Sequence, residues 1–124
     1  MKNIKIKKIE SVILSGSFGD QKYYGYNNQK KIISLVKIKT DSGHYSYGES
    51  LAGIYSPEIF KKNLKVLSLE FKNKKIFDCL KLCKDLQKNK FFLYQGILKN
   101  ILASIEMGLL HLISKIKKKA FLQL

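Results

Sequence analysis

Carboxylates and imidazoles are the side chains of this sequence that could bind a metal ion or transfer a proton. The nine carboxylates are scattered along the chain, at Glu10, Asp20, Asp41, Glu49, Glu58, Glu70, Asp78, Asp85 and Glu106. None of them has the close, regular spacing of a cation-binding loop. His44 falls in a turn sequence and His111 in an apolar helical stretch, and each fits a polar structural role better than general-base chemistry. We therefore expect no catalytic, cofactor-binding or metal-binding residue in this chain.

Cys79 and Cys83 are the two thiols, and they stand four residues apart in a stretch with helical period. This spacing places both on one face of a helix. No second pair of ligands accompanies them, so the pattern favours neither zinc nor a disulfide. We predict a buried, reduced pair, as is typical of a cytoplasmic protein.

The charge is strongly unbalanced, with 24 lysines, no arginine and a net charge of +15. Such a charge is typical of proteins that bind nucleic acid or an anionic membrane surface. Arginine, however, makes the bidentate contacts to phosphate and guanine, and its complete absence argues against a nucleic-acid partner. We interpret the lysines mainly as a solvated surface.

The length of 124 residues corresponds to one domain and is too short for a (β/α)₈ barrel, which needs about 250 residues. No signal peptide follows the basic N-terminus. The most apolar stretch, residues 97–116, is interrupted by Lys99, Glu106, His111 and Lys115. We therefore expect no membrane span and a cytoplasmic location.

Three strands are predicted in the first half of the chain. Residues 4–14 are rich in β-branched side chains, with a phase slip near Lys7 that indicates a bulge. Residues 31–40 alternate as a second strand, and residues 44–49 return antiparallel to it after the turn sequence at 41–43. The predicted sheet is a three-stranded meander.

The period changes to 3.6 after residue 55, which predicts about three helices. Ser56 and Pro57 have the residue types of a helix start, and the first buried stripe is Phe60, Leu64, Leu67 and Phe71. Further helices are expected at about 76–87 and 97–117. The last helix is apolar nearly all round, and we expect Leu98, Leu102, Met107 and Leu110 to face outward and to make the isolated chain self-associate or fold marginally.

Four sequence strings, in order, resemble the N-terminal capping domain of the enolase superfamily, in its mandelate racemase/muconate lactonizing enzyme branch. They are residues 6–10 for the first strand, 36–43 for the second strand and turn, 47–58 for the third strand and the loop after it, and 94–96 with 103–110 for the last helix. The resemblance covers essentially residues 1–124 as a single α+β cap domain. The chain departs from the family pattern at Leu110-His111 and at Ala120, and the catalytic barrel is absent from it.

The resemblance implies a substrate-enclosing cap of a Mg²⁺-dependent enzyme that removes a proton α to a carboxylate, with acid-sugar dehydration or racemisation as the expected outcome. A missing C-terminal barrel would hold the metal and the bases, so this fragment should be inactive alone. Its partners would be that barrel, a small carboxylate substrate and, in a homo-oligomer, further copies of the chain.

Two loops of the cap would enclose the substrate, by resemblance. The first contributes Phe18, Tyr23, Tyr24 and Tyr26, and the second contributes Leu51, Ile54 and Tyr55. Alternatively, the aromatic residues fold back on the sheet, Leu51 or Ile54 fills the core beneath the first helix, and Glu49 and Ser50 are hydrogen-bonded framework.

A second interpretation of the whole chain remains open. In it, the chain is a free-standing, Lys-rich α+β module that binds nucleic acid or another polyanion through charge. A steep salt dependence of binding without sequence preference would favour that interpretation.

Overall fold

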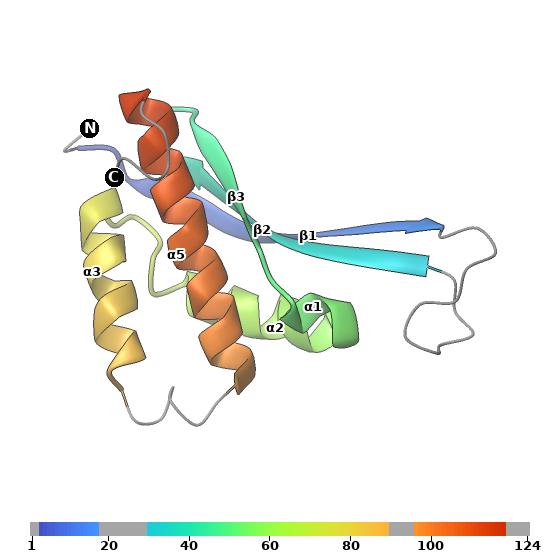
Figure 1. The fold of residues 1–124 in the computed structure, drawn as a ribbon. Coiled ribbons are helices and arrows are strands. Elements are labelled where there is room, and N and C mark those ends of the chain that lie inside the picture. Colours follow the sequence, from blue (N-terminus) through green and yellow to red (C-terminus); the bar gives the residue numbers. More distant parts are fainter. Residues whose placement is uncertain (1–2, 18–29, 90–95, 119–124) are drawn as a thin grey trace.

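The structure is a computed structural model that describes residues 3–17, 30–89 and 96–118. Three strands come first, β1 (Ile6–Ser17), β2 (Lys30–Thr40) and β3 (Tyr45–Glu49), followed by helices α1 (Ala52–Tyr55), α2 (Pro57–Ser68), α3 (Ile76–Gln87) and α5 (Gly96–Lys117). The strands form one antiparallel sheet in the order β1-β2-β3. Figure 1 shows α5 crossing the sheet, with α3 beside it. The predicted α+β class and the three-stranded meander are confirmed.

The two irregularities predicted in the sheet are present. The pairing of β1 with β2 shifts register between Ile6 and Lys8, which is the bulge indicated by the phase slip. The turn between β2 and β3 has Gly43 at a φ of +86°, a conformation that glycine adopts without steric cost. The hydroxyl of Thr40 closes this turn by donating to the carbonyl of His44 at 3.0 Å.

The core lies between the sheet and the helices. Val36 and Ile38 of β2 are fully buried, as are Phe60 of α2 and Ile105 and Leu109 of α5. These side chains belong to one hydrophobic cluster that also includes both cysteines. A single continuous core of this kind makes the described residues one folding unit.

Helix α5 packs closely on β3 because two glycines face each other where they cross. A Cβ placed on Gly48 would lie 2.9 Å from the carbonyl carbon of Ser104 and 3.2 Å from the backbone nitrogen of Gly108. The hydroxyl of Ser46 donates to the carbonyl of Gly108 at 2.6 Å across this contact. The absence of a side chain at Gly48 thus sets the position of α5 over the sheet.

The start of α2 differs in detail from the prediction. Ser56 and Pro57 occupy the expected positions, but the Ser56 side chain makes no capping hydrogen bond. The carbonyl of Ser56 accepts the backbone N–H of Phe60 at 3.0 Å instead. Phe71, predicted at the end of this helix, is fully buried in the turn that follows it. The helix α3 has the bounds that the sequence predicted.

One prediction for α5 is wrong, because Leu102 is fully buried rather than exposed. The helix contacts β3 and β2 on one side and α3 and α2 on others. These elements together cover more of its circumference than the sequence led us to expect. Met107 is 46% exposed, as expected, whereas Leu98 and Leu110 are half-buried. The outward apolar surface is therefore smaller than predicted.

By length and composition alone, α5 is long and apolar enough to cross a membrane, in contrast to the expectation drawn from its charged residues. Core helices of soluble proteins meet the same criterion. Here the buried residues of α5, which include Ile101, Leu102 and Leu112, belong to the same hydrophobic cluster as the sheet.

Candidate functional site

The segment after β3 is fixed to the sheet by a buried hydrogen-bonded corner. The backbone N–H of Ser50 donates to the carbonyl of Ser34 at 2.9 Å, and the hydroxyl of Ser34 donates back to the carbonyl of Ser50. Both serines are buried. This reciprocal pairing extends the β2–β3 contact by one residue and ends the strand where α1 begins.

Helix α5 holds the same segment from the other side through Asn100 and Ser104. The Asn100 side-chain oxygen accepts the hydroxyl of Ser50 at 2.8 Å and the backbone N–H of Ala52 at 3.1 Å. The hydroxyl of Ser104 donates to the carbonyl of Glu49 at 2.7 Å. Ser50 is thus hydrogen-bonded framework, which was one of the two alternatives that the sequence left open.

Sequence reasoning missed both anchors on α5. Their signal is present, because Asn100 and Ser104 are four residues apart and interrupt the apolar residues of that helix. Such a pair lies on one face and can bind the backbone of a neighbouring segment. Their partners are about 50 positions away in the sequence, so the spacing alone does not reveal which segment they hold.

The short helix α1 lies directly against β2 and was not predicted. A Cβ on Gly53 would come within 2.6 Å of the Ser34 hydroxyl oxygen and 3.0 Å of the Phe60 ring. Only a glycine permits this approach. Since Ser34 also binds Ser50, strand β2 fixes both the start and the middle of the segment.

The candidate loop residues differ in how far the structure describes them. Leu51 is 57% exposed, so it does not fill the core beneath the first helix, and Ile54 is half-buried. Tyr55 ends α1, but its side chain lies outside the described part of the chain. Phe18, Tyr23, Tyr24 and Tyr26 also lie outside the described residues. Figure 1 shows α1 at the same side of the domain as the ends of β1 and β2 that lead to residues 18–29.

Among the described residues, no group of three or more His, Cys, Asp or Glu side chains could hold a metal ion. The Glu10 carboxylate forms ion pairs with Lys39 and Lys8, each at 3.1 Å, and these hydrogen bonds lower its pKa. His44 lies exposed in the turn, where its Nδ1 is 2.8 Å from the Ser42 hydroxyl. These residues do not fit a Mg²⁺ site, nor do they pair as an acid and a base.

The two cysteines are buried and free, as predicted. Burial raises the pKa of Cys79 to about 11 and that of Cys83 to about 12, because the protein interior disfavours the thiolate. The Cys79 thiol lies 3.7 Å from the carbonyl of Phe71. Both behave as small apolar core residues rather than nucleophiles.

No family model and no curated protein matches the sequence. Solved structures do match, and they belong to much longer proteins. A member of the enolase superfamily from a Polaromonas species is similar at a TM-score of 0.73 and 20% identity, over 91% of this chain and 31% of that one. The 3,6-anhydro-D-galactonate cycloisomerase from Zobellia galactanivorans is similar at a TM-score of 0.70 and 22% identity, over 91% of this chain and 29% of that one.

A third structure, a mandelate racemase/muconate lactonizing protein from Herpetosiphon aurantiacus, is similar at a TM-score of 0.68 and 12% identity, over 94% of this chain and 32% of that one. The chain spans about a third of the length of these structures. The resemblance stated from the sequence motifs is confirmed at the level of fold: the chain has the fold of one part of the enolase-superfamily proteins, consistent with their N-terminal cap.

Proposed function

We propose that this chain is the substrate-enclosing cap domain of an enolase-superfamily enzyme of the cytoplasm that removes a proton α to a carboxylate. The observation that carries the proposal is the fold match, which includes more than nine-tenths of this chain but only about a third of each matching protein. A match that covers nearly all of this chain and about a third of each longer protein is what a cap domain of such an enzyme would give.

The segment after β3 supplies the structural support for this role. Ser50 and Ala52 are held by Asn100, so Leu51 between them is presented to solvent on a fixed backbone. An apolar side chain held in this way can contact a substrate or exclude water from a site on another domain. We assign the same role to Ile54 and Tyr55 and to Phe18, Tyr23, Tyr24 and Tyr26 of the first loop.

Mg²⁺ enters this proposal only through the barrel, because the described carboxylates of this chain are dispersed. When bound there, the metal would stabilise the enediolate formed after proton removal. Residues of this chain would contribute enclosure and contacts to the part of the substrate far from the reacting carbon. Calorimetry of the isolated chain should accordingly detect no stoichiometric Mg²⁺ site of micromolar affinity.

The test is performed on a protein that joins this chain to a barrel. Incubation in D₂O with a panel of acid sugars, followed by ¹H NMR, should show loss of the α-proton signal, and EDTA should abolish it. Leu51→Ala should lower kcat/KM for the accepted acid. Val66→Ala is the matched control, because Val66 is 70% exposed on α2 and carries no part of the proposed site. If the two substitutions change kcat/KM equally, Leu51 is not part of the proposed site.

The alternative function, binding of nucleic acid or another polyanion by a free-standing module, is favoured by the net charge of +15 alone. Its signature is an affinity for single-stranded DNA that falls steeply with salt and ignores sequence. Affinity that persists at 200 mM salt with a defined sequence preference would contradict the charge-only form of this alternative.

A further inference from the structure

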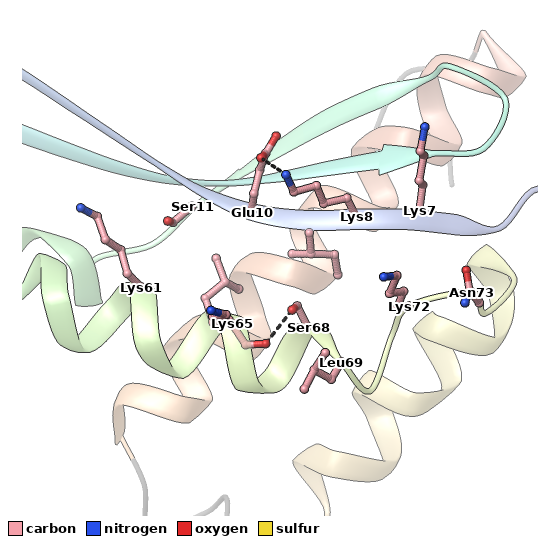
Figure 2. A pocket seen from close by; sticks show the side chains of 12 residues that line it. Lys7, Lys8, Glu10, Ser11, Lys61, Lys65, Ser68, Leu69, Lys72 and Asn73 are labelled. Carbon is pink, nitrogen blue, oxygen red and sulfur yellow. Dashed lines mark hydrogen bonds and ion pairs between the residues drawn. The ribbon is translucent and has the colours of Figure 1, made fainter.

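A groove of about 770 Å³ runs between β1 and α2, on the far side of β1 from β2 (Figure 2). Residues 7–11 of β1 are five consecutive lining residues. Successive side chains of a strand point to opposite faces of a sheet, so a groove that contacts all five follows the edge of β1 rather than one of its faces. The groove is separate from the segment after β3.

Among the described residues, this edge of β1 is paired only at its beginning. The backbone N–H of Asn73 donates to the carbonyl of Ile6 at 2.8 Å, and the N–H of Ile6 donates to the carbonyl of Lys74 at 2.9 Å. In the part of the chain that the structure describes, no other segment makes backbone hydrogen bonds to this edge after Ile6. A free edge of this kind is a template for a further strand.

The walls of the groove carry an excess of positive charge. Lys61, Lys65 and Lys72 line it from the α2 side, and Figure 2 shows Lys61 directed toward β1. Glu10 is the one carboxylate among the described lining residues, and its charge is already neutralised by Lys8 and Lys39. Lys65 and Lys72 form no salt bridge with any described residue.

The two walls have similar lengths. Residues 7–11 of β1 extend about 13 Å at the rise of a strand, and residues 61–69 extend about 12 Å at the rise of a helix. Ile9 and Leu64, both buried, form an apolar floor between them. The groove therefore has an apolar centre, a basic rim and a strand edge along one side.

We propose that this groove binds an extended acidic peptide segment, which adds to the edge of β1 as a fourth, short strand. Backbone hydrogen bonds to β1 would supply affinity, and carboxylates on alternate residues would meet Lys61 and Lys65 of α2 and Lys72 of the turn after it. The same lysines repel a second copy of this chain, which carries a charge of +15. None of the described residues that line the groove is aromatic, so this part of the lining offers no ring on which nucleic-acid bases could stack.

The test uses the full 124-residue chain and a blocked hexapeptide of alternating glutamate and valine. Calorimetry should show binding, and exchange should slow for those backbone amides of residues 8–12 that point away from β2. A peptide of the same sequence with N-methyl groups on alternate amides keeps its charge but loses the donors of one edge. We expect this peptide to bind about tenfold more weakly or worse.

Two double variants of equal charge locate the binding. Lys65→Gln with Lys72→Gln should weaken the hexapeptide about tenfold at low salt. Lys81→Gln with Lys84→Gln is the control, because both lysines are exposed on α3 outside the groove, and it should change affinity less than about twofold.

Three outcomes would overturn the inference. The first is that the N-methylated peptide binds as tightly as the unmodified one, and the second is that the two double variants lose the same amount of affinity. The third is that single-stranded DNA binds more tightly than the peptide and loses affinity by the same factor in the Lys65/Lys72 variant. The inference does not depend on the proposed enzyme function.

Discussion

Replacement of Gly48 by alanine tests the contact between β3 and α5 on which the rest of the fold depends. The added methyl carbon would lie 2.9 Å from the carbonyl carbon of Ser104 and still closer to its oxygen. Ordinary contacts of a Cβ begin at about 3.4 Å, and the Ser104 oxygen is the nearest atom, so β3 and α5 would have to separate by more than about 1 Å. The atoms in the way belong to backbone, which cannot rotate aside.

The expected loss of stability combines two effects. Overpacking of a closely packed interior costs about 1–3 kcal/mol. Separation would also stretch the hydrogen bonds from Ser46 to Gly108 and from Ser104 to Glu49, which are 2.6 Å and 2.7 Å long, at about 1 kcal/mol each. We therefore expect a loss of about 3–5 kcal/mol, which lowers Tm by at least about 10 °C for a domain of this size.

Urea and thermal unfolding, followed by circular dichroism, measure this loss. Gly16→Ala is the matched control, because Gly16 also lies in a strand but a Cβ there would meet nothing within 4 Å. The control should change the free energy of unfolding by less than about 0.5 kcal/mol. Equal stability of Gly48→Ala and the control would mean that α5 does not approach β3 in this way.

Three further predictions concern the core and the segment after β3. Between pH 9 and 11, the free energy of unfolding should fall as pH rises, because Cys79 and Cys83 have a folded-state pKa of about 11 and about 12 against an ordinary 9.0, so the unfolded chain loses these protons first. A variant with alanine at both positions should lack this part of the fall. An identical pH profile of the variant and the original chain would argue against burial of the thiols. Leu102→Gln should lower the free energy of unfolding by about 2–5 kcal/mol, whereas Met107→Gln should change it by less than about 0.5 kcal/mol, because only Leu102 is buried. A urea titration measures both, and a larger loss for Met107→Gln than for Leu102→Gln would mean that α5 is rotated. Asn100→Ala should cost about 1–2 kcal/mol and speed amide exchange in α1, and unchanged exchange there would show that Asn100 does not hold this helix.

Most of the secondary structure could be predicted because local patterns determine it. The alternation in β2, the glycine at position 43 and the apolar stripe of α3 are each local signals, and each element lies where it was expected. The end of α2 was less predictable. Phe71 continues the helical stripe and is buried, yet the helix ends at Ser68, before Asn73 adopts a positive φ of 64°.

The features that could not be predicted depend on contacts between distant segments. Leu102 is buried by other elements of the fold, and the sequence does not show where those elements lie in space. It was therefore expected to face outward. The helix α1 is four residues long and has too few positions for a period. Its support by Asn100 joins residues 48 positions apart. The groove beside β1 likewise exists only because α2 returns to that edge.

The central claim, that this chain is the cap of a larger enzyme, is tested most directly by the genomic codons that follow Leu124, read in all three frames. The account predicts about 250 residues of alternating strands and helices, with a Lys-x-Lys motif and spaced carboxylates at strand ends, in frame or after a frameshift. An unrelated coding sequence in every frame, with no such barrel, would contradict it.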